Sequence, residues 1–165
     1  MPTPLRALIS RLALGLFTLV TLTTATACAQ TRDDYIDDID QACASVNARF
    51  GDELKFNGKN FGTAKDLKRL AQRRSTLKNL LHQVDAFEIP EKTSPPKKWI
   101  KKIDELIKYM KKLKGEWENL PPGSDLYLAM STGEVDDYVN DVSKAAKGYG
   151  LKTCAHTNSW KIFPK

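Results

Sequence analysis

The sequence predicts an all-α protein: an up-down antiparallel four-helix bundle with one disulfide, preceded by an N-terminal signal peptide. Three observations predict this fold. Apolar residues recur at steps of three and four along four stretches of the chain. The connections between these stretches are short and rich in glycine or proline, which favours antiparallel neighbours. Two cysteines remain once the leading segment is removed.

The leading segment has the features of a cleavable signal peptide. Arg6 and Arg11 precede an uncharged run at residues 12–22, which is too short to span a bilayer as a helix. The protein is therefore expected to be exported. Because the chain has 26 Lys or Arg and 20 Asp or Glu, removal of these two arginines leaves a net charge of +4.

Small residues after this run offer two cleavage points. A cut before Cys28 removes residues 1–27 and resembles the lipobox of bacterial lipoproteins, so Cys28 would carry a lipid anchor. Ala25 stands where a lipobox usually has Leu. A cut before Gln30 removes residues 1–29 and releases the protein, and retention as a membrane helix is the third alternative.

Cys43 and Cys154 remain as an even pair in an oxidising compartment, so we expect them to be bonded to each other. A cross-link that closes a loop of about 110 residues stabilises the fold by roughly 4–5 kcal/mol in the chain-entropy model. The alternative is a zinc site that adds His156. It lacks a fourth ligand at a metal-like spacing, so no metal is expected.

The first helix is predicted over residues 32–50, followed by a glycine-rich connection at residues 51–62 that forms either a turn or a small hairpin. Cys43 lies on the apolar seam of this helix, so its sulfur is expected to face the interior. The seam consists of Ile36, Ile39, Cys43, Val46 and Phe50.

The second helix is predicted to start at Thr63, with Asp66 in its first turn. Arg74 fills one step of its apolar stripe. Either its stem packs while the guanidinium reaches water, or it forms an anion or carboxylate site at the mouth of the bundle. The apolar members of the stripe are Leu67, Leu70, Leu77, Leu81 and Val84.

The third helix gives the strongest periodic signal. Ser94 and Pro95 match an N-cap followed by proline at the first helical position, and prolines at residues 121–122 end the helix. Twenty-two residues give a length of about 33 Å. The stripe consists of Trp99, Ile103, Leu106, Met110, Leu113, Trp117 and Leu120, widened by Ile100 and Ile107.

A short turn at residues 124–130 is predicted to lead into the fourth helix, which starts at a capping box of Ser131 and Glu134. Gly148 and Gly150 end this helix. Its stripe consists of Val135, Tyr138, Val142, Ala145 and Tyr149. The bundle thus covers residues 32–155, and a tail at residues 156–165 is apolar enough to dock on the bundle or on a partner.

Charge is segregated along the chain. Residues 55–78 hold eight Lys or Arg against one acid, and residues 92–114 hold nine Lys against two acids. The first and fourth helices instead open with acidic residues. Helix dipoles and solubility explain much of this pattern, but not Lys97 and Lys98, which lie at the unfavourable end of the third helix. The residues that we expect to meet an anionic partner are Arg73, Arg74, Lys97, Lys98, Lys101, Lys102 and Lys108.

The sequence carries no motif for catalysis. His82 and His156 belong to no metal, nucleophile or haem-attachment pattern, and there is no phosphate loop or nucleophile elbow. We therefore expect neither an enzyme nor a cofactor. Nucleic acid is not expected as a partner, because export removes it and no recognition motif is present.

One short motif resembles a known family. Cys43, the pair Pro95-Pro96 and the run from Ala145 to Cys154, with its Tyr-Gly-Leu-x-x-Cys, are similar to a loose family of actinobacterial small secreted proteins and lipoproteins. The resemblance implies a helical bundle in which a first-helix cysteine pairs with a C-terminal one. It carries no assigned activity.

Two functions are compatible with these features. The first is an exported, lipid-anchored, non-enzymatic binding module of the cell envelope that engages an unknown protein or an anionic envelope component through the basic second and third helices. The second is a secreted effector or immunity-type protein that acts on membranes, or on another exported protein, through an exposed apolar stripe. Self-association through Trp99 or Trp117 would favour the second function.

Overall fold

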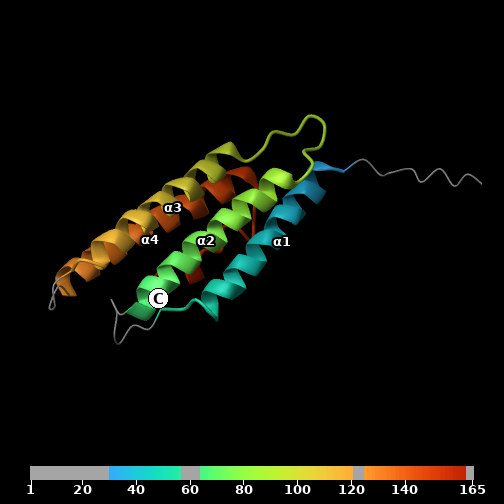
Figure 1. The fold of residues 1–165 in the computed structure, drawn as a ribbon. Helices are drawn as coiled ribbons and strands as arrows, with labels where there is room; N and C mark the ends of the chain where they lie inside the picture. The colour runs from blue at the N-terminus through green and yellow to red at the C-terminus, as the bar shows by residue number, and fades with distance from the viewer. Residues whose placement is uncertain (1–29, 57–63, 121–124, 163–165) are drawn as a thin grey trace, which may run out of the picture.

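The computed structural model of the protein describes residues 30–56, 64–120 and 125–162, with the side chains of all of these except 125–132. Within these residues the chain forms helices and no strand, and successive helices alternate in direction (Figure 1). The predicted up-down four-helix bundle is confirmed. The helices are α1 (Arg32–Gly51), α2 (Ala64–Ala86), α3 (Lys97–Trp117), α4 (Asp125–Tyr149) and the short 3-10 helix η1 (Asn158–Trp160).

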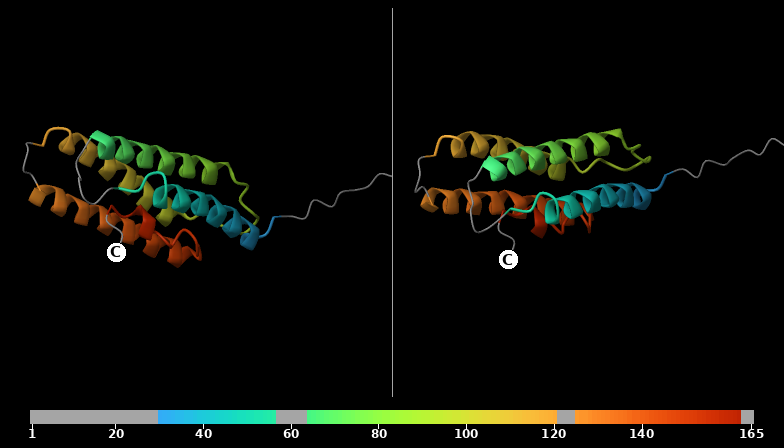
Figure 2. Two further views of the ribbon diagram at one scale, coloured as in Figure 1. Left: turned by 90° about the horizontal axis from the view of Figure 1, so that it is seen from below. Right: turned by 60° about the horizontal axis from the view of Figure 1, so that its bottom comes forward.

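The helices form two layers. Figure 2 shows α2 beside α3 in one layer and α1 with α4 in the other. α2 packs against α1 and α3, and α3 packs against α4, while η1 packs against α1. The segment after Tyr149 joins α1 to α4: Asn47 of α1 donates to the carbonyl of Thr153, and Ser143 of α4 donates to the carbonyl of Ala155.

The predicted seam of α1 faces the core. Four of its five residues are buried, Ile36 is partly buried, and Tyr35 is buried in addition. The helix starts at a capping box, in which the Thr31 hydroxyl accepts from the Asp34 N–H and the Asp34 carboxylate accepts from the Thr31 N–H. Residues 57–62 of the connection to α2, and the predicted cap Thr63, lie outside the described residues.

Leu70, Leu77 and Val84 of the predicted α2 stripe are buried, and the prediction is wrong by one residue at the arginine. Arg73, which is 1% exposed, occupies the core position, and Arg74 is only half-buried. Leu67 and Leu81 are partly buried at the margin of the core. The buried residues of α2 are Asp66, Leu70, Arg73, Thr76, Leu77, Leu80 and Val84.

The stripe of α3 is confirmed. Trp99 to Trp117 are buried at the predicted steps, and Leu120 packs against the core beyond the end of the helix. The predicted start was wrong by two residues, because Pro96 occupies the N-cap position and the helix begins at Lys97. No side chain caps this helix.

The predicted turn at residues 124–130 is wrong, since α4 already begins at Asp125. Glu134 is therefore inside the helix, where it accepts a hydrogen bond from the hydroxyl of Tyr109 on α3. The predicted end is correct: Gly150 adopts φ 105°, and the N–H groups of Gly150 and Leu151 both donate to the carbonyl of Ala146.

Cys43 and Cys154 form the predicted disulfide, with an S–S distance of 2.02 Å across 111 residues of sequence. The zinc alternative is wrong because both sulfurs are used in this bond. The start of the tail docks on its own bundle, where Trp160 is 0% and Ile162 1% exposed. Among the described residues, no helix is both long enough and apolar enough to cross a bilayer. The predicted signal peptide and Cys28 lie outside those residues.

Candidate functional site

The middle of α3 carries lysines that are paired with acids. Lys102 Nζ lies 2.8 Å from Asp141 of α4 and 3.0 Å from Glu105, and Lys101 lies 3.9 Å from the same Glu105. The hydrogen bond that Lys102 donates to Asp141, followed by the one that it donates to Glu105, raises the pKa of Lys102, and the first of these lowers the pKa of Asp141. Of the predicted binding residues, Lys101 and Lys102 are thus partly neutralised by their neighbours.

Arg73 was predicted to meet an anionic partner, and this prediction is wrong. Its guanidinium is buried and donates to four backbone carbonyls. Nε donates to Leu54 at 3.0 Å, one terminal nitrogen donates to Trp160 at 2.9 Å and Lys161 at 3.2 Å, and the other donates to Phe50 at 3.1 Å. These acceptors belong to α1, the turn after it and the tail.

Aromatic rings complete the surroundings of Arg73. The guanidinium carbon lies 4.6 Å from the ring centroid of Phe50 and 4.5 Å from that of Phe56. Burial, and secondarily the charge of Arg69, lowers the pKa of Arg73. The hydrogen bonds of Arg73 therefore join the end of α1 and the tail to α2. The buried guanidinium is not accessible to an external ligand.

Arg74 and Lys108 do come together, as predicted, on the outer side of α2 and α3. With Lys78 and Lys111 they line a hollow of about 290 Å³, which we call the basic groove. Asp104 also lines it, but its carboxylate lies 2.6 Å from Lys108 Nζ, and this hydrogen bond raises the pKa of Lys108.

The remaining cations of the basic groove have no acidic partner among the described residues. In the part of the chain that the structure describes, no carboxylate lies within ion-pair distance of Arg74, Lys78 or Lys111. Lys78 and Lys111 were not among the predicted binding residues. Their spacing could have indicated them, because Lys78 follows Arg74 by four residues and Lys111 follows Lys108 by three, which places each pair on one helix face.

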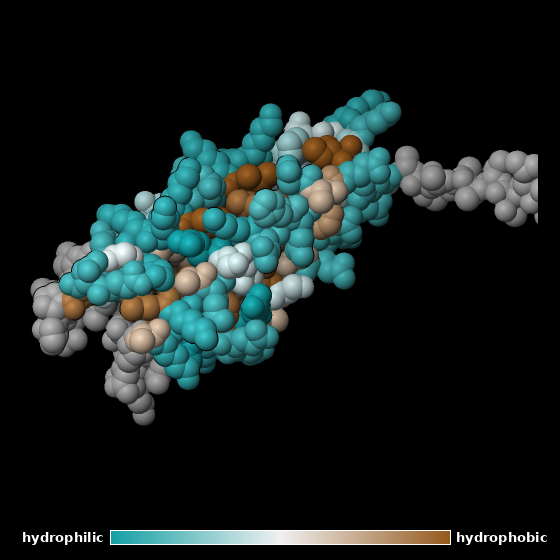
Figure 3. Space-filling model, in the orientation of Figure 1, coloured by the Kyte–Doolittle hydropathy of each residue, from teal (hydrophilic) through white to brown (hydrophobic). Residues whose placement is uncertain are grey.

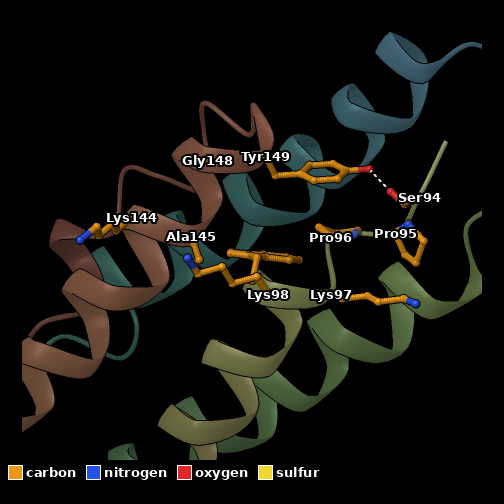
Figure 4. Close-up of a pocket in the computed structure, with 10 residues that line it drawn as sticks. Ser94, Pro95, Pro96, Lys97, Lys98, Lys144, Ala145, Gly148 and Tyr149 are labelled. Carbon is orange, nitrogen blue, oxygen red and sulfur yellow. Dashed lines mark hydrogen bonds between the residues drawn. The ribbon is translucent and has the colours of Figure 1, made fainter.

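Lys97 and Lys98 do not reach the basic groove. They lie at the start of α3, where Lys98 points towards the side of Lys144 on α4 and Lys97 points away from it (Figure 4). These residues surround a cavity of about 390 Å³, which we call the terminal pocket. It is lined by Ser94, Pro95, Pro96, Lys97, Lys98, Trp99, Lys144, Ala145, Gly148 and Tyr149.

The apolar stripes face inward. Hydrophilic side chains dominate the face shown in Figure 3, with small separate apolar areas between them. Trp99 is 0% and Trp117 4% exposed, so neither ring is available for self-association in this fold. Ile89, at 46%, is the exposed large hydrophobic residue among the described side chains.

His82 and His156 are exposed side chains on α2 and in the tail. Within the described residues, no group of three or more His, Cys, Asp or Glu side chains is placed to hold a metal ion. What the described geometry offers is two places that can attract an anion, the basic groove and the terminal pocket. No known family model matches the chain, and no curated protein or solved structure gives a significant match.

Proposed function

We propose that this protein is an exported, lipid-anchored, non-enzymatic binding module of the cell envelope, which engages an anionic partner through the basic groove. The observation that carries this proposal is the contrast between two groups of cations. Lys101 and Lys102 are held by acids, whereas Arg74, Lys78 and Lys111 have no ion pair among the described residues.

The basic groove suits a ligand with repeated negative charges. Two cations project from α2 and two from α3, with Asp104 as the one acid in the lining. An anion that binds there replaces no existing ion pair of Arg74, so its attraction is not offset by a lost partner. The planar guanidinium also offers two parallel hydrogen bonds to a carboxylate or phosphate.

Export and anchoring have separate support. Disulfides persist in oxidising compartments, and the bond between Cys43 and Cys154 is buried in the core. The signal-like segment and the small residues before Cys28 point to lipid attachment at that cysteine. Mass spectrometry of the mature N-terminus tests this part, because an unmodified chain that begins at Gln30 would contradict the anchor.

Binding to model polyanions tests the basic groove. The protein lacking residues 1–29 should bind both polyphosphate and polyglutamate at low ionic strength, and uncharged dextran should not bind. Binding should weaken as salt rises, since the Debye length falls to about 10 Å at 0.1 M salt. Absence of polyanion binding at low salt would overturn the proposal.

A pair of matched variants separates the basic groove from the overall charge. The double substitution Arg74→Glu and Lys111→Glu should weaken polyanion binding by about tenfold or more. Lys101→Glu with Lys112→Glu changes the net charge equally, but both of these lysines are ion-paired at exposed positions. Equal losses in the two variants would show that net charge alone acts.

A further inference from the structure

The terminal pocket shares no residue with the basic groove and differs from it in composition. Its position between the start of α3 and the end of α4 brings together two kinds of side chain (Figure 4). Cations come from Lys97, Lys98 and Lys144. Apolar surface comes from Pro95, Pro96, Ala145 and the ring of Tyr149, with the fully buried Trp99 beneath it.

The walls of the terminal pocket are fixed in the absence of any ligand. The Tyr149 hydroxyl donates to the carbonyl of Ser94 at 2.6 Å, which ties the end of α4 to the segment before α3. Arg32 of α1 donates to the Tyr149 carbonyl at 3.0 Å, and its guanidinium lies 5.5 Å from the Tyr149 ring centroid. Trp99 is fully buried. A ligand would therefore find a preformed cavity and lose little free energy in ordering it.

The cations of the terminal pocket are available. Neither Lys97, Lys98 nor Lys144 is ion-paired within the described part of the chain. Asp141 is the nearby acid, and its pKa is lowered chiefly by the hydrogen bond that it accepts from Lys102 and only secondarily by the charges of Lys144 and Lys98.

One further donor group has no acceptor among the described residues. The Nε1–H of Trp99, a residue that lines the pocket, is buried and has no hydrogen-bond partner in the described structure. Buried donors without a partner are uncommon in folded proteins. At the start of α3 the N–H of Lys97 donates to the carbonyl of Pro95 at 2.8 Å, no side chain caps the helix, and the positive end of the helix dipole lies there.

We propose that the terminal pocket binds a small organic anion, a carboxylate carried on an aliphatic or aromatic body. The carboxylate lies near Lys98 and Lys144, and the apolar body lies against Pro96 and the ring of Tyr149, in front of the buried Trp99. The volume of about 390 Å³ is within the roughly 300–1,000 Å³ range of small-molecule pockets. This site is additional to the proposed function, because no residue of the basic groove lines it.

Nuclear magnetic resonance with octanoate and phenylacetate as probes tests the proposal. Either probe should shift the indole N–H signal of Trp99 in a saturable way, with a Kd of about 1 mM or tighter for ligands of this size. The indole of Trp160 is an internal reference, since its N–H already donates to Asn47. Acetate lacks the apolar body and octanamide lacks the charge, so neither should saturate in the same range.

Gly148 allows the pocket to be filled without strain. A Cβ at Gly148 meets no atom within 4 Å, and the same is true of Gly115 on α3, which does not line the pocket. Gly148→Leu should abolish the Trp99 shift, whereas Gly115→Leu should retain it. Lys98→Gln with Lys144→Gln should weaken octanoate binding by about tenfold or more, while polyanion binding at the basic groove is retained.

These results distinguish the two sites. Loss of octanoate binding in Gly148→Leu, with polyphosphate binding intact, supports a separate pocket. A Trp99 signal that does not respond to either probe would overturn the inference, even if the basic groove binds polyanions. Equal binding of octanoate and octanamide would overturn the anionic specificity, and binding that survives Gly148→Leu would place the ligand elsewhere.

Discussion

Asp40 of α1 accepts a hydrogen bond from the backbone N–H of Cys154, at 2.9 Å, one helical turn before the cysteine to which Cys154 is bonded. Its second oxygen accepts from the N–H of Lys152 at 2.8 Å. Asp40 is only 9% exposed. A buried carboxylate and a disulfide therefore hold the same segment of the tail against α1.

Asp40→Ala should lower the free energy of unfolding by about 1–3 kcal/mol, because it leaves two N–H groups of the tail without their acceptor. Urea unfolding of the oxidised protein measures this change. Asp37→Ala is the control, since Asp37 is an exposed acid on the same helix, and its effect should stay within about 0.5 kcal/mol. Equal effects of the two substitutions would contradict a specific role for Asp40.

Replacing both Cys43 and Cys154 by alanine should lower the free energy of unfolding by about 4–5 kcal/mol in the chain-entropy model, since the bond closes a loop of more than 100 residues. Thermal unfolding of this variant and of the oxidised protein gives the comparison. Two thiols that react with a labelling reagent in the purified native protein would show that the bond is not formed.

Arg73→Lys should be strongly destabilising, by about 2–4 kcal/mol, although it keeps the positive charge. A lysine has no planar fork to reach four carbonyls at once, so buried acceptors lose their donors. Arg74→Lys is the matched control and should change stability by less than about 0.5 kcal/mol. Chemical denaturation of both variants measures the difference, and a mild effect of Arg73→Lys would contradict the fastening role of Arg73.

The capping box of α1 predicts a dependence on pH. The hydrogen bonds from Thr31 lower the pKa of Asp34 below its ordinary value of 3.8. The stability that this carboxylate contributes is therefore fully present above pH 3.8 and is lost as the pH falls through its pKa in the folded protein.

Thr31→Ala tests this dependence. It should raise the pKa of Asp34 towards 3.8, as measured by nuclear magnetic resonance titration of the carboxyl carbon. The stability difference between the wild type and Thr31→Ala should narrow as the pH falls below that value. A titration midpoint of Asp34 that is the same in both proteins would contradict the capping box.

The sequence predicted α3 best because its apolar residues follow one helical face without interruption from Trp99 to Trp117. The prediction from the sequence failed at Arg73, because an analysis of hydrophobic periodicity assigns arginine to the surface. The carbonyls that make its burial tolerable come from Phe50 and Trp160, and Trp160 is 87 positions away in the sequence. A pattern within one helix contains no information about such acceptors.

The prediction of where α4 begins failed for a different reason. Ser131 and Glu134 have the spacing of a capping box, yet the helix already begins at Asp125. The partner of Glu134 is Tyr109, a residue of another helix. A local motif that also occurs inside helices cannot by itself fix where a helix begins.

The candidate sites could be predicted in part. Arg74 and Lys108 were found because charge is segregated in the sequence, and their neighbours Lys78 and Lys111 follow at helical spacing. The terminal pocket could not be predicted, because Lys144 comes close to the start of α3 only when α3 packs against α4. The pairing of Lys102 with Asp141 depends on the same packing.

The contact between Arg32 and Tyr149 places the start of α1 at the end of the bundle that holds the terminal pocket. A lipid on Cys28 would leave at most about 7 Å of chain before Gln30. The bilayer would then lie close to that end of the molecule. The α3 residues of the basic groove, from Asp104 to Lys111, are about 10–21 Å further along the helix than Lys97, so the groove lies further from the anchored end of the bundle than the terminal pocket. A molecule anchored in this way could bind small amphiphiles in the terminal pocket, close to the bilayer, while its basic groove binds a partner in the surrounding envelope.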